Sequence, residues 1–303
     1  MGGRVPHRAP RTRAARPAAR ATRRRSRKRF GQHFLAPAWA HKVVEAINPA
    51  PGDVFLEIGP GTGALTVPLA GSGAPILAVE IDRDLIRDLA PRIPPHVTLL
   101  PGDVLDVEVV AFLRGFTPTH PPDATHTEPP PRRPRVVGNL PYNAATPILL
   151  HLIDLHRRHH FFADATVMVQ REVADRLAAR PGSKAYGALT ITAAVHTRVS
   201  RLLTLPPGAF SPTPRVHSTL IRMEFIDPTV KLADQVLFHR LVRALFSQRR
   251  KMLVNALKAF DATAPAVLAL ADIDGRRRPE TLQVQEIARL VEIFASVRQG
   301  AML

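Results

Sequence analysis

The sequence predicts an α/β fold in which a mostly parallel sheet is followed by a smaller helical part. Short apolar strands alternate with segments of helical periodicity over residues 53–169, which is typical of right-handed β-α-β units. From about residue 234 the apolar spacing is helical throughout, so we place a boundary at 228–234. A chain of 303 residues is long enough to bury the cores of one large and one small domain.

Five strands are expected in the first part. The first, 53–58, runs into a glycine turn, and the others are expected at 76–80, 97–101, 135–139 and 165–169. Helices are expected between them at 62–71, 83–92, 106–114 and 147–158. Pro147 suits the first turn of the last of these helices, with Thr146 as its N-cap. Two later strands are expected at 199–205 and 217–225, with a proline-rich turn between them.

Positive charge is concentrated at the start of the chain. The formal net charge is +17, and residues 1–29 hold twelve Lys and Arg residues and no acid, which leaves 30 basic against 25 acidic residues elsewhere. Such an excess indicates a polyanionic partner, most simply nucleic acid. The Arg-, Ala- and Pro-rich composition predicts a disordered basic tail over 1–27. It is interpreted as a solvated extension, an RNA-binding arm or, with the poorest fit, an organellar transit peptide.

Several classes of protein are excluded by composition. The chain has no cysteine, which excludes disulfides, cysteine-bound metal clusters and thiol nucleophiles. No apolar run approaches the roughly 18 residues of a spanning helix, and no apolar segment of a secretory signal follows the basic start. We therefore expect a cytoplasmic protein with no membrane partner and no metal site. Seven prolines within 117–134 predict an irregular surface loop.

The glycine turn after the first strand is a candidate binding site, with the sequence Gly59-Pro60-Gly61-Thr62-Gly63. Glycines let a ligand approach the backbone closely and present amide donors at the start of a helix. Glu80 ends the next strand, 21 residues after Gly59, where a carboxylate can accept hydrogen bonds from two ribose hydroxyls. With Ala64 the turn also fits the looser dinucleotide pattern, so a NAD enzyme and a methyltransferase both remain possible at this point.

Asp103 follows the third expected strand. A carboxylate there can accept a hydrogen bond from an adenine amino group, and its simpler interpretation is a turn or helix-capping aspartate. Because the carboxyl ends of parallel strands share one edge of a sheet, the glycine turn, Glu80 and Asp103 together predict an adenosine-shaped site.

The tetrapeptide after the fourth strand, Asn139-Leu140-Pro141-Tyr142, favours one chemistry. The amino nitrogen of adenine is a weak nucleophile that must be held by hydrogen-bond acceptors, and the Asn139 side chain and the Leu140 carbonyl can supply two. Pro141 favours an extended Leu140 and offers no amide donor. Tyr142 can stack on the base. A methyltransferase acting on an adenine amino group needs these residues, whereas a NAD dehydrogenase does not; the simpler interpretation is a turn with a packed tyrosine.

A second basic concentration lies within 208–258, centred on Arg249-Arg250-Lys251. It falls in the part expected to be helical, where a run of charge is often only a solvated face. Because the chain carries other signs of nucleic-acid binding, we predict that Arg249, Arg250 and Lys251 contact RNA.

At this point the chain resembles the ribosomal RNA adenine N6,N6-dimethyltransferases of the small-subunit type (the kasugamycin-sensitivity methyltransferase type). The resemblance runs from Arg27 to about Phe294. Seven motifs carry it in order: RFGQHFL (29–35), EIGPGTG (57–63), NLPYN (139–143), QREVADRL (170–177), SKAYG (183–187), PPGAF (206–210) and FSQRRK (246–251).

The resemblance implies a Rossmann-like, S-adenosylmethionine-dependent methyltransferase sheet over 28–228 and a small helical rRNA-binding domain over 229–303. It implies that S-adenosylmethionine is the cofactor and that N6 of two adjacent adenosines, in the 3′-terminal hairpin of 16S rRNA, receives two methyl groups each. The implied partner is 16S rRNA within an immature 30S subunit, bound by a monomer that also takes part in small-subunit biogenesis.

The resemblance also assigns residues. The positions matching His33 and Leu35 close over the cofactor, and those matching Gly59, Glu80, Asp103 and Asn139 contact or border it; we add Gly61 and Gly63 from the same turn. Phe210 forms a wall opposite Tyr142. The family usually has Asn where this chain has His33.

Alternatives remain open from sequence. The large-subunit (23S) adenine methyltransferases of the macrolide-resistance type share the fold, although the basic motif and SKAYG favour the small-subunit type. A DNA adenine methyltransferase would more often carry two prolines after the Asn or Asp. A ribosome assembly factor with weak catalysis is opposed by the intact glycine turn and the tetrapeptide.

Overall fold

The computed structural model describes residues 33–115 and 132–300. The predicted tail at 1–27, most of the proline-rich loop at 117–134 and the first four residues of the RFGQHFL motif lie outside the described residues.

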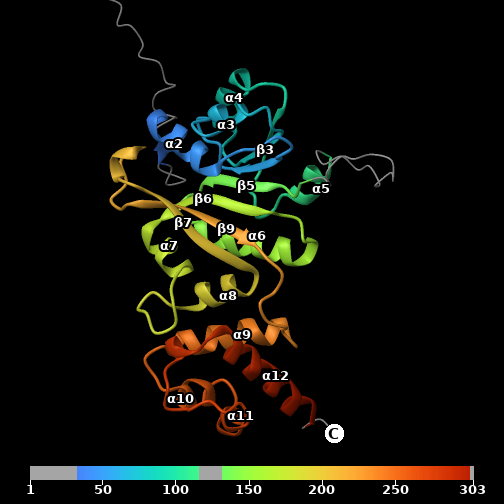
Figure 1. Ribbon diagram of the computed structural model, residues 1–303, viewed down its shortest axis with the longest axis vertical. Helices are drawn as coiled ribbons and strands as arrows, with labels where there is room; N and C mark the ends of the chain where they lie inside the picture. Colours follow the sequence, from blue (N-terminus) through green and yellow to red (C-terminus); the bar gives the residue numbers. More distant parts are fainter. Residues whose placement is uncertain (1–32, 116–131, 301–303) are drawn as a thin grey trace, which may run out of the picture. The chain divides into compact units, whose positions relative to one another are not determined.

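A seven-stranded sheet forms the centre of the described structure, in the order β4-β3-β2-β5-β6-β9-β7 (Figure 1). Its strands are β2 (Phe55–Ile58), β3 (Ile76–Glu80), β4 (Val97–Pro101), β5 (Arg135–Asn139), β6 (Asp164–Gln170), β7 (Thr197–Leu205) and β9 (Ser218–Phe225). The first five in spatial order are parallel, and β9 pairs antiparallel with both β6 and β7. The predicted fold class, a mostly parallel α/β sheet with a helical part after it, is confirmed.

Helices cover both faces of this sheet. They are α2 (Pro37–Ile47), α3 (Thr66–Ala70), α4 (Arg83–Leu89), α5 (Val109–Arg114), α6 (Ala145–His159), α7 (Arg171–Leu177), α8 (Ala188–His196), α9 (Gln235–Ser247), α10 (Leu253–Lys258), α11 (Ala264–Leu270) and α12 (Val284–Gly300). Apolar residues of α2 and α3 share one core with one face of the sheet, and those of α5 to α8 share another core with the opposite face. A separate antiparallel pair joins β1 (Phe34–Leu35) to β8 (Phe210–Ser211).

Three helix starts differ from expectation, and one of them is α5, which begins at Val109 rather than at residue 106. The helix expected from residue 62 begins at Thr66, because Gly61 and Gly63 have φ of 58° and 81° and keep the chain in a turn. The helix after the fourth strand begins at Ala145, so Thr146 is inside it, and the N-cap Ala144 has no side-chain hydrogen bond to offer. Pro147 does lie in the first turn, where its missing amide donor costs nothing.

Helices α9 to α12 form the expected helical part, and their core is continuous with α8. Leu241 and Leu245 of α9 pack in the same cluster as Ile191 and Val195 of α8, which itself lies between the sheet and α9 (Figure 1). The domain limits of 28–228 and 229–303 therefore stay predictions. Among the described helices, none is both long and apolar enough to cross a membrane.

Strands β2 and β5 approach each other very closely at Gly138. A Cβ on this glycine would lie 2.5 Å from the carbonyl oxygen of Ile58, its register partner on β2. Only glycine therefore allows the two strands to pair at this point.

We predict that Gly138→Ala destabilises the protein by about 1–3 kcal/mol, because the added methyl group meets backbone that cannot move without breaking the ladder. Urea unfolding measures this change. Gly208→Ala is the matched control, since a Cβ there meets no atom within 4 Å. Equal stability of the two variants would contradict the prediction.

Candidate active site

The polar residues predicted at four strand ends meet at one edge of the sheet. Strand register places Ile58 beside Val79 and Gly138, so Gly59 and Asn139 follow neighbouring positions, and the Gly102 amide donates to the Glu80 carbonyl at 2.9 Å. The strand order reverses between β2 and β5. In open α/β sheets the crevice at such a reversal is where ligands bind.

The glycine turn is packed on two sides and open on one. Its three glycines all have positive φ, which fits the tight turn that the sequence predicts. A Cβ on Gly61 would meet the Phe34 ring at 3.0 Å, and one on Gly63 would meet Leu89. Nothing lies within 4 Å of a Cβ on Gly59. The turn thus leaves room for a ligand at Gly59, next to Asn139.

Glu80 holds the turn in place from the neighbouring strand. Its side chain is buried, and its two carboxylate oxygens accept from the Gly61 amide at 3.0 Å and the Asp82 amide at 2.9 Å. Burial raises the pKa of Glu80, and the two amide hydrogen bonds oppose that rise. A carboxylate has about four acceptor positions, so Glu80 can hold the turn and still accept from ribose hydroxyls.

Glu57 is a polar residue of this site that the sequence analysis did not single out. It lies within the buried strand β2, is 1% exposed, and its Oε2 has no hydrogen-bond partner among the described residues. Burial raises the pKa of Glu57 to about 8, with a further contribution from the charge of Glu80. This pKa favours the neutral form of Glu57 at pH 7. The available signal was an acid inside an otherwise apolar strand sequence, Phe-Leu-Glu-Ile.

Two further residues lie close to Glu80. Asp103 is half-buried, and its Oδ1 accepts a hydrogen bond from the Leu105 amide at 3.0 Å, as expected for a turn aspartate. Its other carboxylate oxygen, Oδ2, is left for a ligand. Ile81, directly after Glu80, is 46% exposed. A large apolar side chain held open beside these carboxylates offers a surface for an aromatic base, and the sequence analysis missed it.

Asn139 is oriented by the backbone of His33. Its Nδ2 donates to the His33 carbonyl at 2.6 Å. A carbonyl oxygen only accepts, so the amide nitrogen must face it and Oδ1 must point elsewhere. The next residue, Leu140, is buried and its amide donates to Met168 at 3.1 Å. Asn139 is thus held with its acceptor oxygen available.

Tyr142 is held from two sides. Its hydroxyl hydrogen-bonds the buried Ser218 Oγ at 2.7 Å, and the His33 ring stacks on it with 5.2 Å between centroids. The same imidazole hydrogen-bonds the Pro212 carbonyl through Nδ1 at 2.6 Å. His33 therefore contacts both Asn139 and Tyr142. Neither Ser218 nor this use of His33 was predictable from sequence spacing.

Phe210 and Leu35 pair across the short sheet of β1 and β8. Both are buried, at 3% and 5% exposure, and both belong to the core that includes Leu69. The structure thus brings His33, not Phe210, against Tyr142. The role of Phe210 as a wall for the base stays a prediction, and it requires movement of this ring out of the core.

The basic motif lies in a turn between α9 and α10, which corrects the expectation of a helix. The helix stops at Ser247. Arg249 donates to the Ser183 carbonyl at 3.1 Å and pairs with Glu280 at 3.6 Å, whereas Arg250 and Lys251 are exposed. The three residues are therefore not equivalent: one makes contacts within the protein and two are open to a partner.

A groove of about 1090 Å³ runs between α6, α7, α8 and α9. Its lining residues include Thr146, in the first turn of α6. Arg176, Lys184 and Arg243 line it, and within residues 33–115 and 132–300 none of the three forms an ion pair. Asp154, Glu172 and Asp175 line the same groove, which with Arg157 and Arg249 leaves an excess of positive charge that can attract a polyanion.

The family model for "Ribosomal RNA adenine dimethylase" matches residues 23–296. The chain belongs to the ribosomal RNA adenine dimethylase family. The resemblance carried by the seven motifs is confirmed, and a NAD-dependent dehydrogenase is excluded.

Individual relatives agree with this membership. The chain is 40% identical over 275 residues to "Ribosomal RNA small subunit methyltransferase A" of Chromohalobacter salexigens, covering 89% of this chain and 92% of the relative. A crystal structure of a dimethyladenosine transferase from Plasmodium falciparum matches with a TM-score of 0.65 at 22% identity, covering 87% and 98% of the two chains. A 23S rRNA methyltransferase, ErmE, matches with a TM-score of 0.57 at 22% identity, covering 86% and 99%. The two structures confirm the fold that the dimethylase family shares.

We predict that Glu57→Gln removes part of the pH dependence of stability. An acid whose pKa is 4.5 when unfolded and about 8 when folded binds its proton more tightly in the folded state, so its contribution is complete below 4.5 and is lost as pH rises towards 8. The free energy of unfolding of the wild type should fall relative to that of Glu57→Gln across this range, measured by urea titration at several pH values.

Glu45→Gln is the control for this comparison, because Glu45 is exposed on α2. Its stability should follow that of the wild type at every pH. A constant difference between the wild type and Glu57→Gln from pH 4.5 to 8 would show that Glu57 is ionised in the folded protein.

Proposed function

We propose that the protein transfers methyl groups from S-adenosylmethionine to N6 of two adjacent adenosines in the 3′-terminal hairpin of 16S rRNA. The proposed substrate is this rRNA within an immature 30S subunit in the cytoplasm, the proposed enzyme is a monomer, and the reaction belongs to small-subunit biogenesis. The observation that carries the proposal is the position of Asn139 beside the open side of the glycine turn, with Tyr142 linked to it through His33. Family membership supplies the class of reaction.

The residues at the edge of the sheet fit an adenosyl cofactor. Glu80 would bind the ribose hydroxyls, Asp103 the adenine amino group through Oδ2, and Ile81 the face of the base, while Gly59 allows close approach. When bound, the cofactor supplies a methyl group already activated by the positive charge of its sulfonium. These residues therefore only bind and orient, and holding reactants in line supplies up to about 7–11 kcal/mol of a barrier.

The target adenine must leave its stack, at a cost of a few kcal/mol. Stacking on Tyr142 offsets roughly 1–3 kcal/mol of this cost. Asn139 Oδ1 accepts one amino hydrogen, because Nδ2 is already bound to His33, and the Leu140 carbonyl accepts another. The attacking nitrogen becomes acidic only as its new bond forms, so a neutral amide suffices and no strong base is needed. The second transfer keeps only one of the two hydrogen bonds, because one hydrogen is left.

We predict that Asn139→Ala lowers the rate of methyl transfer roughly 10²–10³-fold, the usual loss when one aligned hydrogen bond to a transition state is removed. Labelled S-adenosylmethionine and unmethylated 30S particles provide the assay, and mass spectrometry of rRNA digests identifies the product. Asn255→Ala, at an exposed position on α10, is the control and should keep wild-type turnover.

Two results would count against the proposed function. Folded Asn139→Ala with wild-type turnover would remove Asn139 from the reaction. Methylation of 23S rather than 16S rRNA by the wild type would identify the large-subunit specificity instead.

The exposed cations supply the RNA-binding surface of this proposal. Arg250 and Lys251 lie open in the turn after α9, and the exposed Lys184 and Arg243 line the groove together with the half-buried Arg176. A chain of phosphates can follow such a path and release its counterions.

We predict that Arg250→Ala and Lys251→Ala each lower the salt slope of RNA binding by about 0.7–0.9, the value for one phosphate contact. Arg249→Ala should leave the slope unchanged and lower thermal stability instead, since it loses Ser183 and Glu280. Filter binding over a range of salt concentrations measures the slopes. An unchanged slope in the first two variants would remove the turn from the RNA-binding surface.

A further inference from the structure

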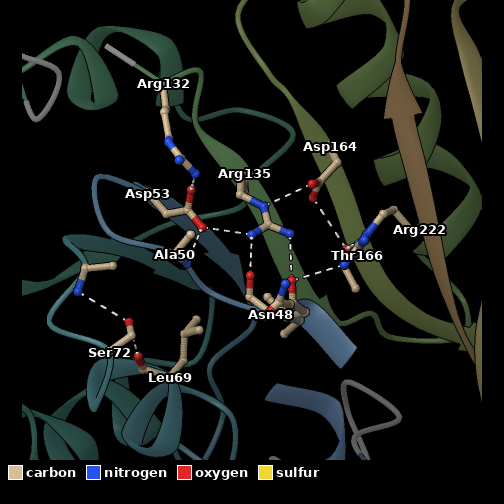
Figure 2. A network of polar contacts seen from close by, with 12 residues as sticks. Asn48, Ala50, Asp53, Leu69, Ser72, Arg132, Arg135, Asp164, Thr166 and Arg222 are labelled. Atoms are coloured by element: carbon tan, nitrogen blue, oxygen red, sulfur yellow. Dashed lines mark hydrogen bonds and ion pairs between the residues drawn. The ribbon is translucent and has the colours of Figure 1, made fainter. Parts of the chain in front are cut away.

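Figure 2 shows a network of polar contacts around Arg135. Arg135 begins β5 and Asn139 ends it, so the network lies at the opposite end of this strand from the candidate site. The Arg135 side chain is 11% exposed and pairs with Asp53 at 2.8 Å and with Asp164 at 2.9 Å. Arg222 on β9 lies beside it and donates from Nε to Thr166 Oγ1 at 3.3 Å. We call Arg135 and Arg222 the arginine pair.

The arginine pair also binds the end of α2 (Figure 2). Arg135 donates to the Ile47 carbonyl at 2.8 Å and to the Asn48 carbonyl at 3.2 Å, and Arg222 donates to the Ala46 carbonyl at 2.8 Å and to Ile47 at 3.1 Å. The last carbonyls of a helix have no partner within the helix, and cations there are favourable. Helix α2 has no basic residue in its own last turn, so two strands supply the charge.

The other end of α2 leads directly into the candidate site. Strand β1 precedes the helix, the Ala36 amide donates to the Ala209 carbonyl at 2.9 Å, and the His33 carbonyl accepts from Asn139 at 2.6 Å. The segment 33–48 therefore contacts β5 at both ends of this strand. The end of α2 binds Arg135, which begins β5, and His33 binds Asn139, which ends it.

The lengths of the two elements match. Eleven residues of helix at 1.5 Å each span about 16 Å, and five residues of strand at 3.3 Å each span about 16 Å. A shift of α2 at the arginine pair is thus passed along a stiff helix to the residues that cover the glycine turn, where the Phe34 ring lies against Gly61.

We propose that Arg222 is a positioning residue for the candidate active site. Together with Arg135 it fixes α2 along β5, and so holds His33 and Phe34 over Asn139 and the glycine turn. It touches neither substrate nor cofactor. This proposal rests on the proposed function for its effect on cofactor binding, and on the contacts alone for its effect on α2.

Arg222 is the better of the two residues to test. Removing Arg135 would leave the half-buried Asp164 without its cation and the buried Asp53 with only the more exposed Arg132, which is costly for folding. The described partners of Arg222 are a hydroxyl and carbonyl oxygens, so its removal strands no charge. Arg222→Met keeps the length of the stem, and Arg222→Lys keeps the charge and can restore part of the contact.

The chain's single tryptophan, Trp39, lies on α2 and reports on the position of this helix. For Arg222→Met we expect acrylamide to quench Trp39 more strongly and the amides of residues 33–47 to exchange hydrogen faster. Isothermal titration should show that S-adenosylmethionine binds about tenfold more weakly. Binding must then reorder a helix α2 that has lost its charged hydrogen bonds to Arg222, and one such bond accounts for a change of this size. The KM for this cofactor should rise with it, kcat should fall because His33 also orients Asn139, and Arg222→Lys should be intermediate.

Arg198→Met is the matched control, because Arg198 sits on the neighbouring strand β7 and contacts only Glu224, at 3.5 Å, among the described residues. It should behave as wild type in every measurement. The proposal is overturned if Arg222→Met leaves Trp39 quenching and exchange at 33–47 unchanged, or if it only lowers thermal stability while cofactor affinity stays at the wild-type value. If Arg222→Met does not fold, Arg222→Lys decides by the same readouts. If the wild type bound no S-adenosylmethionine, the proposed function would be refuted. Trp39 quenching and hydrogen exchange at 33–47 would still show whether Arg222 fixes the position of α2.

Discussion

Strands β2 and β5 pair so closely at Gly138 that the Ile58 carbonyl leaves no room for a side chain on the opposite strand. This contact joins the two halves of the parallel sheet at the point where the strand order reverses. The glycine turn leaves one half and the Asn139 tetrapeptide leaves the other, so these two candidate segments start one strand spacing apart, about 4.8 Å. A bulkier residue at 138 would separate the two halves of the site before it affected any side chain within it.

The same edge concentrates negative charge, and the fold accommodates it in two different ways. Glu80 is buried but receives two backbone amides, which stabilise its charged form, and it thereby fixes the turn. Glu57 is buried more completely, and its pKa of about 8 favours its neutral form near pH 7. Two ionised carboxylates beneath one turn would repel each other in a medium of low dielectric constant, and protonation of Glu57 relieves this repulsion.

The parallel strands could be predicted from the sequence because each is a short apolar run that ends in glycine or a polar residue. Glu80, Asp103 and Asn139 could be predicted as candidate site residues because they lie at the ends of these strands. Helix α8 could not be predicted, because its own apolar residues, such as Leu189, Ile191 and Ala193, are spread around the helix and form no single apolar face. Strands β1 and β8 have two residues each and exist only through their contact with each other. The burial of Glu57 and the bond from Tyr142 to Ser218 likewise depend on residues distant in sequence.

His33 shows why a departure from the family's usual asparagine need not disturb the site. The contact that orients Asn139 uses the His33 carbonyl oxygen, which every residue possesses, so it does not depend on the side chain. The side chain is then free to make contacts of its own, and here the imidazole bridges Tyr142 and the Pro212 carbonyl. The backbone of one residue thus orients the Asn139 amide while its ring stacks on Tyr142. Because β1 and α2 carry this residue, a displacement of that segment reaches both groups together, which is why contacts at the far end of β5 bear on the geometry at its near end.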